Sequence, residues 1–172
     1  IGNTSSILFD GVNDYCEVPT STGFDFIQSQ DIQWDCWLYI NRDTIATDYI
    51  FERSSAGTAS YYFAIIDNNT IRFQEWVGGV TTRDFDLHKD IPVYQWVHFT
   101  FHRTFNGYAH VYMDGVPAST ARVDIGNTGI SGGSPLRFGM GESNWAEYYI
   151  DEIRILQSPR GSASGNTGAD TP

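Results

Sequence analysis

The sequence predicts an all-β fold, in which two antiparallel sheets pack as a sandwich. Apolar and polar residues alternate along most of the chain, as they do in strands that bury one face. Residues typical of turns separate these segments at intervals of about 8–12 residues, which is the strand spacing of sandwiches and jelly rolls. No segment repeats its apolar residues with a helical period, so we expect at most one helical turn, near residues 24–29.

The strand assignments rest on two kinds of pattern. Alternation is clearest at residues 32–40, where Ile32 and Trp34 alternate with Gln33 and Asp35, and it recurs at 97–101 and 109–113. The other strands are expected where β-branched and aromatic residues lie between turn signals. They are residues 6–9, 15–18, 49–53, 61–66, 70–77, 80–87, 136–140 and 150–156.

The hairpin after residue 101 carries a conflicting local signal. Asn106-Gly107 is typical of a two-residue type I′ turn, which would pair Phe101 with Tyr112. That register would place a core-facing residue opposite an outward-facing one, and register follows the buried face. We therefore expect a loop of three or five residues, with Phe101 opposite Met113.

Length and composition indicate one domain, residues 1–156, followed by a different kind of segment. A chain of 172 residues is long enough to bury roughly 70% of its unfolded surface. Residues 157–172 are rich in Ser, Gly and Asn, so we interpret them as a linker, or alternatively as an arm on a neighbouring subunit. The chain begins at Ile1 without a signal peptide, which we interpret as a processed product or an excised domain.

Charge restricts the class of partner. The chain has 21 acidic and 10 basic residues and a net charge of −11, which disfavours nucleic acids and anionic membranes. No apolar run approaches the ~18 residues of a membrane span. Neutral sugars and divalent cations are the more compatible partners for this surface.

The two cysteines allow two interpretations. Cys16 and Cys36 both fall at apolar positions of strand patterns, so they can be two separate buried thiols. In an oxidising compartment they can instead form a disulfide, provided that the fold brings their Cα atoms close enough.

Seven short fragments stand in a characteristic order along about residues 5–156. The fragments are Phe9-Asp10-Gly11 with Asp14-Tyr15 and Val18-Pro19, Phe24-Asp25-Phe26, Asp31-Ile32 with Trp37-Leu38-Tyr39, Trp96-Val97-His98-Phe99, Val111-Tyr112-Met113-Asp114-Gly115, Leu136-Arg137-Phe138-Gly139 and Ile150-Asp151-Glu152-Ile153-Arg154. In this order they resemble the laminin G-like / concanavalin A-like lectin-glucanase superfamily, and the likeness is greatest to modules of phage tail-fibre and other virion proteins and of secreted bacterial proteins. The resemblance implies a concanavalin A-like jelly roll, but little about activity, because this fold has many functions.

A cation site is predicted where the first and last strands meet. Asp10, Asn13 and Asp14 place several oxygen atoms in one tight turn, and Asp151 has the strand phase of Ile153 and Ile155, so we expect it to point inward. Calcium takes six to eight oxygen ligands, and the resemblance implies a structural Ca²⁺ near these loops. The alternative is that these carboxylates cap turns by accepting hydrogen bonds from backbone N–H groups.

A sugar-binding platform is predicted on the outward phase of the strands. Aromatic rings stack on the apolar faces of sugars, while Arg and Gln side chains recognise hydroxyl groups. The alternative is that loops or neighbouring subunits cover this face and that its tryptophans only pack. The candidate ligand-binding residues are Trp37, Tyr39, Arg72, Gln74 and Trp76, with Trp145 at the rim.

We expect no catalytic activity. Glucanases of this fold carry Glu-x-Asp-x-(x)-Glu on one strand, and Asp84 and Asp86 lack the third acid. The predicted function is a non-catalytic carbohydrate-binding module on an extracellular or virion surface protein, such as a phage tail fibre or capsid decoration. The alternative is a structural domain that assembles virions through protein–protein contacts and binds no sugar.

Overall fold

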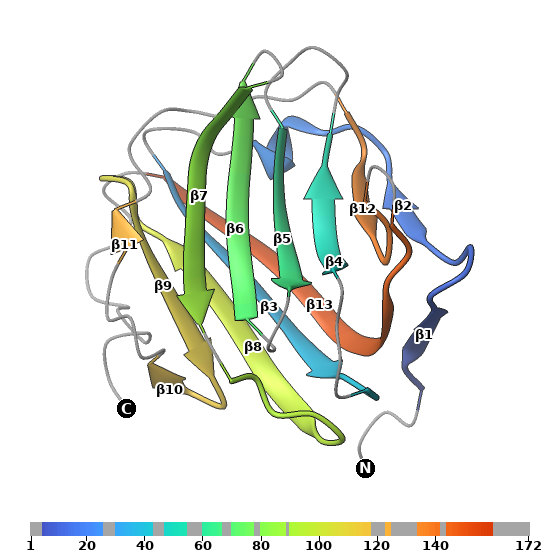
Figure 1. Cartoon of the computed structure of the whole chain (residues 1–172). Helices are drawn as coiled ribbons and strands as arrows, with labels where there is room; N and C mark the ends of the chain where they lie inside the picture. The colour runs from blue at the N-terminus through green and yellow to red at the C-terminus, as the bar shows by residue number, and fades with distance from the viewer. Residues whose placement is uncertain are drawn as a thin grey trace.

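Two antiparallel sheets packed face to face form the computed structural model of the chain (Figure 1). The structure describes residues 5–25, 30–42, 47–54, 60–66, 70–77, 80–88, 90–117, 123–124, 134–141 and 144–159. The predicted all-β sandwich is confirmed. The short 3-10 helix η1 (Thr22–Phe24) lies beside the expected helical turn, whose later residues 26–29 are outside the described ranges.

The strands divide into two sheets, in each of which all neighbours are antiparallel. Within the described ranges, sheet A has seven strands and sheet B has six. In spatial order, sheet A consists of β1 (Ile7–Asp10), β13 (Glu147–Pro159), β3 (Gln30–Tyr39), β8 (Trp96–Arg103), β9 (Tyr108–Met113) and β10 (Val116–Pro117), with β11 (Val123–Asp124) also paired to β9. Sheet B consists of β2 (Cys16–Val18), β12 (Leu136–Phe138), β4 (Thr47–Arg53), β5 (Ser60–Ile66), β6 (Thr70–Val77) and β7 (Val80–His88).

The expected meeting of the first and last strands is confirmed. Ile7 pairs with Ile150 and Asp10 pairs with Glu147, so β1 is an edge strand of sheet A beside β13. The chain then crosses to β2, an edge strand of sheet B (Figure 1). β13 continues to Pro159, so residues 157–159 pair with β3, while residues 160–172 lie outside the described ranges.

The core consists of the inward side chains of both sheets and is dominated by aromatic rings. Trp34 of sheet A stacks on Phe51 of sheet B, with ring centroids 3.9 Å apart. Phe63 of sheet B contacts Phe101 of sheet A at 4.3 Å. These pairs join the two sheets, and their sheet A members Trp34 and Phe101 have the inward phase that the sequence predicts.

The β8–β9 hairpin has a three-residue loop. Thr104 N donates to Tyr108 O at 2.8 Å, and Gly107 adopts a positive φ of 86° within the loop. The prediction of a loop longer than two residues is confirmed, but Phe101 pairs with Val111, so the predicted pairing with Met113 is wrong. The error is two residues, which keeps every side chain on its predicted face.

Both cysteines are free thiols. Cys16 lies on β2 and Cys36 on β3, in different sheets, so the first of the two interpretations above is the one that this structure supports. Burial raises the pKa of the Cys36 thiol well above its ordinary value. No helix long and apolar enough to cross a membrane occurs among the residues that the structure describes.

Two fully buried phenols place hydrogen bonds inside the sandwich. Tyr148 Oη donates to the carbonyl oxygen of Ile50 at 2.8 Å, and its contact with the carbonyl of Tyr49 is 3.1 Å. Tyr61 Oη donates to the carbonyl of Phe24. Burial raises the pKa of both Tyr61 and Tyr148 above the ordinary value.

Alkaline pH is expected to destabilise the domain steeply. The unfolded chain releases its phenol protons near pH 10, whereas the folded chain retains those of Tyr61 and Tyr148. Their contribution to stability is therefore complete below pH ~10 and declines above it, by about 1.4 kcal/mol per pH unit for each phenol. Urea unfolding between pH 8 and 11 measures how steeply the free energy of unfolding falls with pH. Tyr148→Phe should reduce the slope and cost about 1–2 kcal/mol at pH 8 through lost hydrogen bonds; an unchanged slope in this variant would contradict the assignment.

Candidate functional site

The predicted sugar platform is divided between opposite sides of the molecule. Trp37 and Tyr39 alternate on β3 with buried neighbours, so they lie on the outer face of sheet A. Arg72, Gln74 and Trp76 lie on the outer face of sheet B, because the intervening β6 residues are buried. Alternation predicts which side chains of a strand point outward, but not which sheet the strand joins. The predicted platform therefore combined residues of the outer faces of both sheets.

Trp145 belongs to neither face. It forms an isolated bridge with Met140, and its ring centroid is 6.0 Å from that of Tyr15, near the β1–β2 side of the sandwich. The predicted rim position for Trp145 is therefore separate from the other five candidates.

A continuous row of outward side chains crosses all six strands of sheet B. Glu52, the third of its six members, is only 1% exposed. At one end Arg137 Nε donates to Glu17 Oε2 at 2.9 Å. Because paired residues of an antiparallel sheet share a face, the row is Glu17, Arg137, Glu52, Tyr62, Gln74 and Asp84.

The β5–β7 end of this row is a hydrogen-bonded network. Tyr62 Oη donates to Gln74 Oε1 at 2.7 Å, and Gln74 Nε2 donates to Asp84 Oδ2 at 3.0 Å. Arg72 pairs with Asp84 at 3.2 Å and with Asp86 at 2.9 Å. Burial of the Arg72 guanidinium acts to lower its pKa, but the two carboxylates outweigh it and hold the pKa above its ordinary value. The network thus fixes the orientation of an amide and a guanidinium on the surface.

An aromatic cluster adjoins the network. The centroid of Tyr62 lies 4.8 Å from that of Trp76 and 4.9 Å from that of Tyr49. Tyr49 packs on the backbone of Gly141, where an added Cβ would lie 2.2 Å from the ring. Trp76 remains half-buried beside these fixed rings. We define the sheet B platform as Tyr62, Arg72, Gln74, Trp76, Asp84 and Asp86.

The outer face of sheet A carries a different pattern. One row runs in register through Leu8, Tyr149, Tyr39 and Trp96, and its three rings contact one another. We define Tyr39, Trp96 and Tyr149 as the aromatic triad. The neighbouring row pairs Asp151 with Trp37 and Trp37 with His98, whose rings lie 5.1 Å apart.

A buried carboxylate stands further along the same face. Asp35 accepts hydrogen bonds from Gln33, from Thr100 Oγ1 at 2.8 Å and from Arg154 Nη2 at 2.8 Å. With these partners Asp35 needs no ligand to satisfy its charge, so we interpret this cluster as structural.

The four predicted metal ligands do not form one oxygen cage. Asp151 pairs with outward-facing Trp37, so the expected inward orientation of Asp151 is wrong. A β-bulge between Asp151 and Arg154, with Glu152 at φ 51°, reverses the phase, so Asp151 does not face the same way as Ile155. Asp10 pairs instead with Glu147. Glu147 is four residues from Asp151 on β13, a separation of about 13 Å along the strand.

The turn after β1 uses one predicted ligand as a cap. Asp10 Oδ1 accepts a hydrogen bond from Val12 N at 2.8 Å, as in the capping alternative, while Asn13 and Asp14 are exposed in the same turn. Glu147, the carboxylate beside this turn, already contacts Asn41 and Arg42 at 3.3 Å. The described residues contain no group of three or more His, Cys, Asp or Glu side chains that could hold a metal ion. Calcium binding stays a prediction, for which these residues offer no assembled site.

Sequence reasoning missed several residues of the two surfaces. Tyr49 and Tyr62 lie in predicted strands, but each stands in a run of consecutive apolar or aromatic residues, Tyr49-Ile50-Phe51 and Tyr61-Tyr62-Phe63. Alternation therefore gives no phase there. Trp96 and Tyr149 stand at the starts of β8 and β13, and their contact with Tyr39 depends on strand order in sheet A. The outward phase of these tyrosines and tryptophans is the signal that the sequence contains, but it does not tell which strands lie side by side.

Comparison with known proteins gives a family and a shared fold. A sequence model of the family described as the concanavalin A-like lectin/glucanases superfamily matches residues 10–164. The receptor binding domain of botulinum neurotoxin D matches with a TM-score of 0.68 and 15% identity, over 97% of this chain and 44% of that one. The binding domain of Paraclostridial Mosquitocidal Protein 1 matches with a TM-score of 0.66 and 17% identity. That match covers 91% of this chain and 43% of the other chain.

A shorter protein has the same fold. The heptameric SAP-like pentraxin from Limulus polyphemus matches with a TM-score of 0.53 and 17% identity, over 87% of this chain and 74% of that one. The present chain thus spans less than half of the two toxin chains. No curated protein sequence gives a significant match. At these identities the solved structures establish the fold alone.

Proposed function

Because the chain belongs to the concanavalin A-like lectin/glucanases superfamily, we propose that it is a non-catalytic carbohydrate-binding module whose sugar site is the sheet B platform. The observation that carries the proposal is that half-buried Trp76 shares the outer face of β6 with the fixed side chain of Gln74, two residues away, and with that of Arg72, two residues further along. A sugar ring can stack on the indole while its hydroxyl groups exchange hydrogen bonds with the network. Binding domains of two toxins share the fold, which supports a binding role.

The charges of the platform favour neutral sugars. Asp84 and Asp86 have side chains 43% and 36% exposed, and both already engage Arg72. A sialylated or uronic acid ligand would bring a further carboxylate toward these groups and toward a chain of net charge −11. We therefore propose recognition of uncharged glycans on a cell surface or polysaccharide.

The absence of catalysis is part of the proposal. Asp84 and Asp86 are the acidic residues of β7, and both pair with the same arginine, an arrangement that suits hydroxyl recognition. No third acid shares their strand, whereas the glucanase motif requires one.

The Trp76→Ala variant should lose sugar affinity while remaining folded. A glycan array first identifies a neutral oligosaccharide, and calorimetry then measures Kd. Truncation of an aromatic anchor is expected to weaken binding about 10-fold or more. Trp145→Ala is the matched control and should bind like the unmodified chain, because its ring lies outside the platform. A folded chain that binds no neutral glycan, or a Trp76→Ala variant of unchanged Kd, would contradict the proposal.

The setting that we propose is an extracellular or virion surface protein, such as a phage tail fibre or capsid decoration. The low lysine content, the acidic surface and the family support an extracellular module. The second candidate function is virion assembly through protein contacts without sugar binding. It is favoured by the exposed apolar residues of the edge strands β1 and β2 and of the turn between them, which are Ile7, Leu8, Val12, Tyr15 and Val18.

A further inference from the structure

The aromatic triad on the outer face of sheet A has the geometry of a cation-binding cluster. Tyr39 lies 5.6 Å from Trp96 and 5.7 Å from Tyr149, and Trp96 lies 6.5 Å from Tyr149, between ring centroids. The rings are inclined to one another by 55°, 89° and 65°, so they do not form a parallel stack. Trp96 is 41% exposed, and the cluster is therefore open to solvent.

Carboxylates flank the triad on both sides. Glu147 and Asp151 stand two residues before and after Tyr149 on β13 and share its outward face. Asp10 pairs with Glu147 in the adjoining row, and Asp114 accepts a hydrogen bond from the backbone of His98 two residues beyond Trp96. The guanidinium of Arg42 is already paired with Asp48 and Glu147. The carboxylates near the three rings thus outnumber the guanidinium group of Arg42, which Glu147 and Asp48 share.

We propose that the aromatic triad binds a methylated ammonium group. Such a cation is attracted to the faces of Trp and Tyr rings within about 6 Å of their centroids. Since no two centroids are more than 6.5 Å apart, one ammonium group can be in range of all three rings. Its methyl groups contact the rings, while Asp151 supplies the opposite charge.

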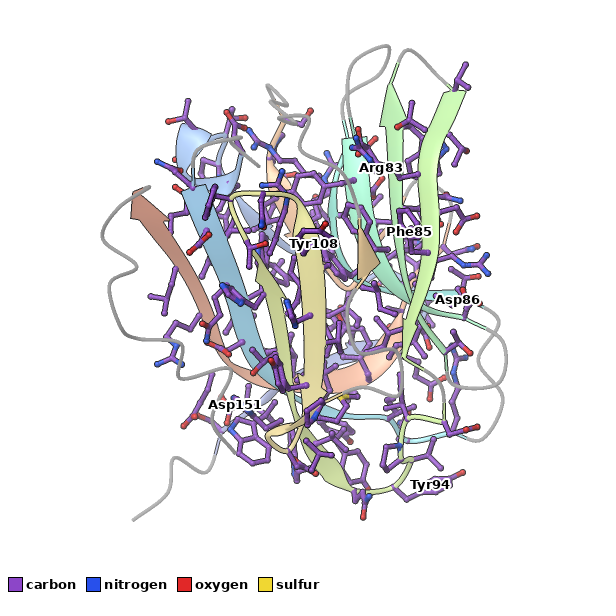
Figure 2. All side chains as sticks on the ribbon, turned by 90° about the vertical axis from the view of Figure 1, so that its left-hand side faces the viewer. Arg83, Phe85, Asp86, Tyr94, Tyr108 and Asp151 are labelled. Atoms are coloured by element: carbon purple, nitrogen blue, oxygen red, sulfur yellow. The ribbon has the colours of Figure 1, made fainter. Side chains whose placement is uncertain are left out.

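This site is independent of the sheet B platform. Figure 2 shows Asp151 on the sheet A side of the sandwich and Asp86 on the opposite, sheet B side. The inference therefore does not rest on the proposed function, and a variant of one surface serves as the control for the other.

Choline and its uncharged isostere 3,3-dimethyl-1-butanol test the proposal on the 172-residue chain. The indole N–H signals in ¹H–¹⁵N NMR spectra report binding at Trp96. Choline should shift the Trp96 signal and saturate with a Kd on the order of 1 mM, as expected for an exposed cation–π site. The isostere should bind at least 5-fold more weakly. Equal binding of both compounds would overturn the proposal, since it would indicate an apolar patch without cation preference.

Variants locate the binding on the triad. Trp96→Leu should weaken choline binding at least 5-fold, which the shifts of the remaining NMR signals measure because the Trp96 signal is then absent. Asp151→Asn should weaken choline binding about 2-fold. Trp76→Leu, on the sheet B platform, should leave it unchanged. Asp151→Asn changes an outward, partly exposed side chain, so it keeps the test valid if Trp96→Leu fails to fold. Unchanged Kd values in folded Trp96→Leu and in Asp151→Asn would overturn the proposal.

The source of the ammonium group is distinguished by one further measurement. Co-sedimentation with phosphatidylcholine vesicles would identify a lipid headgroup as the ligand. Binding of choline without binding to vesicles would assign the site to a soluble or polymer-bound ammonium. Either result, together with the expected choline shifts, supports the proposal.

Discussion

Replacing Arg53 by methionine is expected to destabilise the domain by about 3–5 kcal/mol, the cost of leaving a buried charge without its partner. The Arg53 side chain is 2% exposed and pairs with Asp25 through Nη1. Its Nε donates to the carbonyl of Ser134 at 3.1 Å, and its Nη2 donates to that of Ser21 at 3.1 Å. Arg53→Met therefore strands one carboxylate and two carbonyl groups, and urea unfolding measures the loss.

A double variant separates charge from packing. Arg53→Met combined with Asp25→Leu removes both charges, so it should be more stable than Arg53→Met alone, although the two carbonyls still lack their donor. If the double variant loses the sum of the two single losses, the carboxylate and guanidinium do not act as a pair.

Phe63→Ala is expected to have a comparable effect, about 3–5 kcal/mol, because it opens a cavity at the centre of the core. The Phe63 ring is fully buried and lies 4.5 Å from Phe51, 5.0 Å from Phe73 and 4.3 Å from Phe101. It therefore joins three strands of sheet B to the opposite sheet. The free energy of unfolding in urea checks the value.

The matched control is Phe105→Ala, which makes the same chemical change at the surface. Phe105 is 37% exposed in the β8–β9 loop, so its truncation should cost no more than about 1 kcal/mol. Equal losses for the two variants would mean that Phe63 is not part of a closely packed core.

The sequence was sufficient for the architecture because alternation survives in the central strands. On β3, apolar Trp34 and Leu38 alternate with Gln33 and Asp35. The structure places the first pair in the core and the second pair on the outer face, where hydrogen-bond partners bury Asp35. The closing pair β1–β13 was also predictable, since both segments combine a short apolar strand with acidic residues.

The candidate site was only partly predictable. Arg72, Gln74 and Trp76 were assigned correctly to one outward face, because they share a strand. They lie far from Tyr39 because β6 and β3 belong to different sheets. The sheet that a strand joins depends on pairing between distant segments, which the alternation of apolar and polar residues does not reveal.

The error at Asp151 has a different cause. One extra residue in β13, where Glu152 adopts a left-handed conformation, exchanges the two faces for the rest of the strand. Neither Glu152 nor its neighbours carry the Gly that would mark such a bulge in the sequence.

The pairing of Ile7 with Ile150 also has a consequence during synthesis. A ribosome releases β1 long before β13 exists, at about 5–20 residues per second, so the nascent first strand stays without its neighbour for several seconds or more. Closure of a loop of this length is slow compared with local hairpins such as β8–β9. The opening segment should therefore be the last part of the domain to acquire protection from hydrogen exchange, even though it is made first.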